Sequence, residues 1–153
     1  MGGRIVVGID GSESSVLATR WAADEALMRD ATLDLVCAWD LPAYTDGYGY
    51  APAAVTDDLA QELTKVAEEN LAAALREARA QAPDVRAQTR AVEGQAARIL
   101  LAESRDADLL VVGSRGLGGF RELLLGSISQ QCAHQAACPV VIVRKVPAAA
   151  GTQ

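Results

Sequence analysis

The chain of 153 residues is predicted to fold as a single α/β domain, with helices on both faces of a five-stranded parallel sheet. Three observations predict this fold class. Half of the residues are apolar, which suffices for one buried core at this length. Short apolar runs typical of strands alternate with stretches of helical spacing. No repeat or domain boundary interrupts them, so residues 1–146 are expected to form the domain and 147–153 a flexible tail.

The first strand is expected at residues 4–9, where an unbroken run rich in Val and Ile is typical of a strand covered on both faces. A turn of sequence Asp-Gly-Ser follows at 10–12. Ser12 or Ser14 can cap the next helix, which is expected to run to about Arg29. The apolar face of this helix is expected to hold the residues that recur at helical spacing, namely Leu17, Trp21 and Met28.

A second strand is expected at 33–38, followed by a long exposed loop at 39–55 that holds all three tyrosines. Loops of this length often form lids or partner surfaces, and an unstructured segment is the alternative. An amphipathic helix is expected at 56–81 and ends before Pro83. The remaining elements are expected as an edge strand at 85–92, a helix at 96–104, a strand at 108–112, a helix at 127–136 and a last strand at 139–143.

The formal net charge of −6 disfavours nucleic acid and anionic membranes as partners. No apolar run reaches the roughly 18 residues of a membrane span, and no signal peptide is evident, so a cytoplasmic location is expected. The cysteines are odd in number and lack metal-ligand spacing. Cys37, Cys132 and Cys138 are therefore expected to be small buried thiols, and no metal ligand is assigned.

The segment between the fourth strand and the last helix is rich in glycine. Four glycines fall within residues 113–119, and Gly126-Ser127 stands where the helix is expected to begin. Glycines let several backbone N–H groups converge on one concavity, and a helix start adds its unpaired amides and positive dipole end. A phosphate group would fit there, and a simple turn is the alternative. The segment matches neither a P-loop nor a dinucleotide-binding fingerprint.

A second half-site is expected at the end of the first strand. Ligands of doubly wound sheets bind at the carboxyl ends of strands where the order reverses. If the strand order is 3-2-1-4-5, these are the first and fourth strands. Asp10 could accept hydrogen bonds from ribose or adenine, or act through a divalent cation. The alternative is a turn residue that bonds its own backbone. The backbone of Ala38 could pair with adenine, and the single phosphate loop favours a mononucleotide.

Three motifs occur together. The first is Gly113-x-x-Gly116, which is followed after nine residues by Gly126-Ser127. The other two are Val-Gly-Ile-Asp-Gly-Ser at 7–12 and Cys-Pro-Val-Val-Ile-Val at 138–143. This combination resembles the ATP-binding branch of the universal stress protein family. The resemblance extends over residues 3–145, which is nearly the whole chain.

The resemblance implies a Rossmann-like fold with strand order 3-2-1-4-5 and a cytoplasmic homodimer. It also implies a site for ATP, or for AMP or ADP, where the nucleotide can bind with or without Mg²⁺. Gly8, Ile9 and Asp10 would line the nucleoside, and Ala38 would meet adenine through its backbone. The ribose and phosphates would be held by the glycine-rich segment, through Gly113, Ser114, Arg115, Gly116, Leu117, Gly118, Gly119, Gly126, Ser127 and Ile128.

The same segment favours a binding module over a catalyst. ATP hydrolysis usually requires lysine, an arginine finger and a metal, and the segment offers only Arg115 and Arg121. Glu122 is expected to form a solvated pair with Arg121, and the single histidine, His134, to be structural or exposed. The predicted function is an ATP-binding stress-response protein that acts as a nucleotide-dependent sensor or regulatory module. The alternatives are a slow ATPase or phosphotransferase and a nucleotide-free interaction protein.

The last strand predicts self-association. Val140–Val143 is an apolar strand expected at the sheet edge, where uncovered backbone groups promote aggregation. Antiparallel pairing with a second copy across a two-fold axis would cover this edge, so a homodimer through the last strand is expected.

Overall fold

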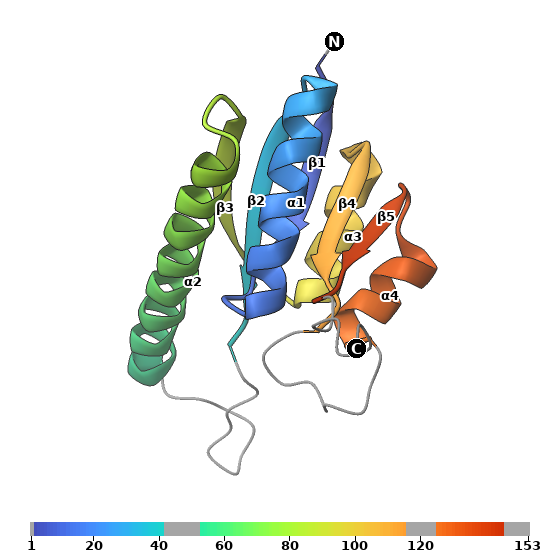
Figure 1. Cartoon of the computed structure of the whole chain (residues 1–153). Helices are drawn as coiled ribbons and strands as arrows, with labels where there is room; N and C mark the ends of the chain where they lie inside the picture. Colours follow the sequence, from blue (N-terminus) through green and yellow to red (C-terminus); the bar gives the residue numbers. More distant parts are fainter. Residues whose placement is uncertain (1, 42–52, 116–124, 146–153) are drawn as a thin grey trace, which may run out of the picture.

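The computed structural model describes residues 2–41, 53–115 and 125–145. These residues form a five-stranded parallel sheet in the order β3-β2-β1-β4-β5, which confirms the predicted fold class (Figure 1). The strands are β1 (Arg4–Gly8), β2 (Thr32–Trp39), β3 (Arg86–Glu93), β4 (Leu109–Gly113) and β5 (Val140–Val143). The helices are α1 (Glu13–Arg29), α2 (Ala53–Gln81), α3 (Ala96–Glu103) and α4 (Ser127–Gln135), with a 3₁₀ turn, η1, at Ser104–Asp106.

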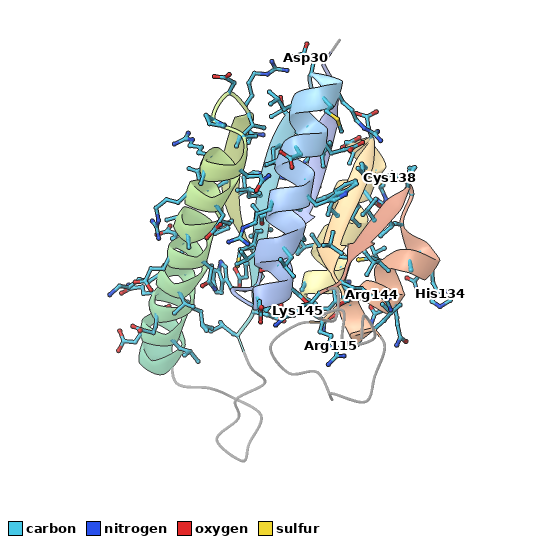
Figure 2. The ribbon with its side chains drawn as sticks, in the orientation of Figure 1. Asp30, Arg115, His134, Cys138, Arg144 and Lys145 are labelled. Carbon is cyan, nitrogen blue, oxygen red and sulfur yellow. The ribbon has the colours of Figure 1, made fainter. Side chains whose placement is uncertain are left out.

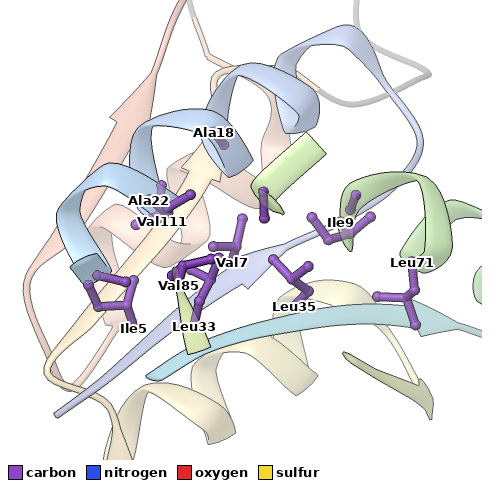
Figure 3. Packing of buried hydrophobic residues seen from close by; sticks show 14 of the residues in the cluster. Ile5, Val7, Ile9, Ala18, Ala22, Leu33, Leu35, Leu71, Val85 and Val111 are labelled. Carbon is purple, nitrogen blue, oxygen red and sulfur yellow. The ribbon is translucent and has the colours of Figure 1, made fainter. Parts of the chain in front are cut away.

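Helices α1 and α2 cover one face of the sheet, and α3 and α4 cover the other (Figure 1). Each face has its own apolar core because side chains alternate along a strand. In β1, Ile5 and Val7 join the core beneath α1 and α2, whereas Val6 joins the core on the opposite face. Figure 3 shows the first of these cores. This double burial explains why β1 is a continuous apolar run rather than an alternating one.

The prediction of which residues form the buried face of α1 is wrong. Trp21 is 37% exposed and Met28 is 75% exposed. The helix instead buries its small residues against the sheet, which are Ser15, Ala18, Thr19, Ala22, Ala23 and Ala26. Small side chains allow the helix backbone to approach the strands closely, so the large ones of the predicted stripe are left on the outer side.

The other element boundaries differ little from the predictions. Helix α2 begins at Ala53, before the predicted start, so the expected loop at 39–55 is shorter at both ends. Residues 42–52 lie outside the described part of the chain, as does the predicted tail at 147–153. Strand β3 is an edge strand with mostly exposed side chains, as its alternation predicts.

The single histidine and the cysteines are placed much as expected. His134 is exposed on α4. All three cysteines are free thiols; Cys37 and Cys132 are buried, whereas Cys138 is only half-buried. Among the described helices, none is both long and apolar enough to cross a membrane.

A charged network lies on the α3 face of the sheet. Asp34 of β2 is 1% exposed, and its Oδ2 accepts hydrogen bonds from Arg4 (2.5 Å) and Arg90 (3.1 Å). Arg90 also pairs with Glu103 at 2.6 Å, and Arg4 contacts the same carboxylate. The network therefore ties β1, β2, β3 and α3 together through one buried carboxylate.

Candidate functional site

The ends of the glycine-rich segment are joined by hydrogen bonds at the carboxyl end of β4. The backbone N–H of Ser114 donates to the Val143 carbonyl (2.9 Å), and the Ser114 carbonyl accepts from the N–H of Gly126 (2.6 Å). The Ser129 hydroxyl donates to the Gly113 carbonyl (2.6 Å). These bonds place the start of α4 directly beside the end of β4.

Among the described residues, no side chain caps the N-terminus of α4. Its N-cap residue is Gly126, which has no side chain to accept a hydrogen bond. The first-turn N–H groups of Ser127 and Ile128 therefore have no acceptor within the helix or from the cap. An anion would satisfy these N–H groups and interact favourably with the helix dipole. Helix α1 differs, because the Ser12 hydroxyl accepts from the N–H of Ser15 at 3.2 Å.

Asp10 holds the turn that follows β1. Its Oδ1 accepts from the N–H (2.9 Å) and the hydroxyl (2.5 Å) of Ser12, so the turn-forming alternative for Asp10 is the one observed. Gly11 lies between them with φ of +81°, a conformation that favours glycine. The other carboxylate oxygen of Asp10 takes part in none of the hydrogen bonds among the described residues. It could accept from a ligand without breaking the turn.

The backbone of Ala38 faces the space beyond the end of β1. The Val36 carbonyl accepts from Ile9 on the β1 side (2.8 Å), and the Trp39 carbonyl accepts from Gly94 on the β3 side (2.7 Å). Because successive residues of a strand direct their backbone groups to opposite sides, the N–H and C=O of Ala38 point toward the β1 side. Strand β1 has already ended there, so a ligand could pair with both groups. Among the side chains of the described residues, only the Cys37 thiol donates to the Ala38 carbonyl, and this contact is long (3.9 Å).

Cys37 is a buried thiol near the end of β2. Burial raises the pKa of Cys37 to about 11, and the nearby negative charge of Asp10 contributes to the increase. The thiol is therefore protonated at neutral pH, which argues against a nucleophilic role.

Packing explains the first glycine of the motif. A Cβ atom added to Gly113 would lie 2.5 Å from the Ser14 Cβ and 2.7 Å from the Ser14 carbonyl carbon. Any side chain at this position would displace the first turn of α1. Gly113 thus brings α1 close to β4, and this contact could not be predicted from the spacing of the glycines.

The structure brings most of the predicted site residues together at the carboxyl ends of the strands. Gly8, Ile9 and Asp10 end or follow β1, and Ala38 lies near the end of β2. Gly113, Ser114, Arg115, Gly126, Ser127 and Ile128 lie at the end of β4 or the start of α4. Gly116, Leu117, Gly118 and Gly119 lie outside the described residues, as do Arg121 and Glu122. The roles of all these residues in binding stay predictions.

Sequence reasoning missed Asn70 of α2. Its side-chain amide lies above the β1–α1 turn, where its Oδ1 would be 2.8 Å from a Cβ atom added to Gly11. A single asparagine in a long helix has no pattern that predicts this contact. In the described ranges, no group of three His, Cys, Asp or Glu side chains could hold a metal ion.

The family model of the universal stress proteins matches residues 1–144 of the chain. The chain belongs to the universal stress protein family. A universal stress protein of Mycolicibacterium smegmatis is 39% identical over 140 residues, which cover 92% of this chain and 45% of the relative. This universal stress protein thus spans about half the length of the curated relatives it matches.

Solved structures of the family share the fold. UspA from Lactobacillus plantarum has a TM-score of 0.79 at 22% identity, covering 93% of this chain and 97% of its own. A universal stress protein in complex with cAMP has a TM-score of 0.63 at 30% identity, covering 93% of this chain and 96% of its own. The resemblance stated from the sequence motifs is therefore confirmed at the level of family and fold.

Proposed function

We propose that this universal stress protein binds an adenine nucleotide, with ATP as the expected ligand and AMP or ADP as alternatives, and acts as a regulatory module in a stress response. The observation that carries the proposal is the uncapped start of α4, which hydrogen bonds hold against the end of β4, the strand that pairs with β1. The similar protein solved in complex with cAMP supports an adenine nucleotide as the ligand.

The residues present fit each part of the nucleotide. The first-turn N–H groups of Ser127 and Ile128 suit the phosphates. The outward backbone of Ala38 suits the edge of adenine, and the unused oxygen of Asp10 suits a ribose hydroxyl. Mg²⁺ is usually held by one or two carboxylates together with phosphates and water, so it would join through the nucleotide rather than through a site built from protein alone.

Binding rather than catalysis is the proposed activity. The nucleotide would alter the surface around the carboxyl edge of the sheet and thereby the choice of a protein partner. A slow ATPase or phosphotransferase is the alternative. Mg²⁺-dependent release of phosphate above the background of a binding-deficient variant would favour that alternative.

A homodimer through β5 and a cytoplasmic location complete the proposal. Strand β5 bonds β4 through the carbonyls of Pro139 and Val143, which accept from Leu110 (3.0 Å) and Ser114 (2.9 Å). By alternation, the backbone groups of Val140 and Ile142 face away from the sheet. These outward groups are available for pairing with a second copy.

Titration calorimetry with Ala38→Pro tests the nucleotide site. Proline removes the N–H that would pair with adenine, yet this N–H faces past the end of β1 and is not needed by the sheet. We expect ATP and AMP affinity to fall about tenfold or more, as for loss of a buried hydrogen bond. Ala38→Ser is the matched control, since it changes the side chain but keeps the N–H.

The proposal fails if wild-type protein shows no heat of binding and no thermal shift with millimolar ATP or AMP. It also fails if Ala38→Pro, shown to be folded by circular dichroism, binds as tightly as Ala38→Ser. Equal affinity for GTP would contradict recognition of adenine.

A further inference from the structure

A hollow of about 380 Å³ opens beside the proposed nucleotide site, at the start of α1. Its wall is built from three segments: Glu13, Ser14 and Leu17 of α1, Ser114 and Arg115 at the end of β4, and Arg144 and Lys145 after β5. Figure 2 shows Arg115, Arg144 and Lys145 gathered at the same end of the molecule, near the first turn of α1. Its volume falls in the range of small-molecule sites, about 300–1,000 Å³.

The hollow is positively charged although the protein carries a net charge of −6. Three cationic side chains line it against one carboxylate, that of Glu13, which pairs with Lys145 at 3.2 Å. Within the described ranges, neither Arg115 nor Arg144 forms an ion pair with a carboxylate. Two of the three cationic side chains therefore have no carboxylate partner among the described residues and could bind an anion.

Uncharged donors in the same wall are also available. Ser114 is 6% exposed, and no hydrogen bond among the described residues uses its hydroxyl. The hydroxyl of Ser14 is likewise absent from those hydrogen bonds. The N–H groups of Glu13 and Ser14, in the first turn of α1, have no acceptor within the helix. These hydroxyl and N–H groups can donate hydrogen bonds to an anionic acceptor in the hollow.

We propose that this hollow is an anion site that takes a phosphoryl group, held by Arg115, Arg144 and Lys145. Arginine presents several N–H donors in a rigid fork that suits phosphate oxygens, and hydroxyl groups can complete the coordination. Ser114 and Arg115 form a wall common to the hollow and the nucleotide crevice, because the Ser114 carbonyl is bonded to Gly126 at the start of α4. The phosphoryl group could therefore be the terminal phosphate of a bound nucleotide or belong to a separate ligand. Only the first source rests on the proposed function.

The test compares two double variants that remove the same charge. Arg144→Gln with Lys145→Gln alters the hollow, and Arg76→Gln with Arg79→Gln alters the exposed surface of α2. Inorganic phosphate, AMP and ATP are titrated into each folded protein at constant ionic strength. We expect the hollow variant to bind phosphate, ATP or both about tenfold more weakly than the control, whereas AMP affinity stays within about twofold.

The two sources give different patterns. Weaker binding of inorganic phosphate indicates a separate phosphoryl ligand, and weaker binding of ATP alone indicates the terminal phosphates of the nucleotide. Glu13→Gln should strengthen the affected binding, because it removes the negative charge from the wall.

Three results would overturn the proposal. The hollow variant could bind phosphate and ATP as the control does, or the wild-type protein could bind neither. An equal loss of AMP and ATP affinity would place these side chains in the nucleoside site instead. A wild-type protein that binds phosphate but no nucleotide would refute the proposed function and leave the anion site standing.

Discussion

Gly11 and Gly113 serve the site for different physical reasons. Gly11 adopts a positive φ of +81°, whereas Gly113 is required because Ser14 lies against it. The turn at Gly11 is evident in the sequence, since Asp-Gly-Ser is a strong local signal. The contact at Gly113 depends on how two segments far apart in the chain pack together, and local patterns carry no such information.

Gly11→Ala should lower the free energy of unfolding by about 1 kcal/mol or more, because alanine is strained at positive φ and its Cβ would meet the Asn70 side chain. Urea denaturation measures the change. Gly2→Ala is the control, since Gly2 is exposed and a Cβ there meets nothing within 4 Å. Equal stability of the two variants would show that the turn tolerates a side chain.

Glu103→Gln should make the free energy of unfolding less dependent on pH in the acidic range. Burial alone would raise the pKa of Glu103, but hydrogen bonds from Arg90 and Arg4 outweigh it and lower the pKa below the ordinary value of 4.5. Its stabilising contribution is therefore complete above about pH 4.5 and is lost as the pH falls through the lowered pKa. We expect Glu103→Gln to cost about 1 kcal/mol at pH 7 and progressively less in more acidic solution.

Denaturation at several pH values measures this difference, with Glu77→Gln as the control. Glu77 pairs with Arg20 at the surface, so its loss should cost less than about 0.5 kcal/mol. A cost of Glu103→Gln that stayed constant between pH 7 and pH 3 would contradict the assigned linkage.

At the scale of single elements, the ends of α1 can be predicted from the sequence, whereas hydrophobic periodicity does not predict its buried face. Its start and end follow from Ser12 as a cap and from Asp30, which adopts a left-handed conformation after the last turn. Its buried face does not follow from periodicity, because the sheet selects the residues that allow the closest approach. Large residues such as Trp21 dominate a periodicity argument but are excluded from this contact.

Ala22→Leu should destabilise the protein by about 1–3 kcal/mol, since Ala22 is fully buried and a larger side chain would push α1 from the sheet. Met28→Ala should change the free energy of unfolding by less than about 0.5 kcal/mol, because Met28 is largely exposed. Thermal or urea unfolding of the two variants measures both effects. A larger loss of stability in Met28→Ala than in Ala22→Leu would instead support the apolar face predicted from the sequence.

At the scale of the whole molecule, the parallel sheet with helices on both faces follows from the residue patterns, whereas the strand order is implied by the family resemblance. Continuous apolar runs predict strands buried on both faces, and helices between them predict parallel crossovers. Asp10, Ala38 and Gly126 lie at the same end of the sheet, the carboxyl ends of its strands, because of that topology. The cations of the hollow do not, because Arg144 and Lys145 are an ordinary basic pair until β5 is placed beside β4.

Val140→Pro should convert the proposed dimer into a monomer. The N–H of Val140 faces away from β4, so proline blocks pairing at the outer edge without removing a bond of the sheet. Light scattering or sedimentation measures the mass, and Val140→Ala, which keeps the N–H, should remain dimeric. A dimeric Val140→Pro protein would exclude β5 pairing as the association mode, and a monomeric wild-type protein would exclude the dimer itself.

Helix α4 has Gly126 as its N-cap, and among the described residues no side chain supplies the missing acceptor. A phosphate bound there would complete the helix from outside, so occupancy of the site and the local order of α4 would be thermodynamically linked. Amide hydrogen exchange in the first turn of α4 should then slow on addition of nucleotide, while the self-capped start of α1 exchanges at an unchanged rate. The ligand would act as a structural part of the protein that the cell can add or withdraw.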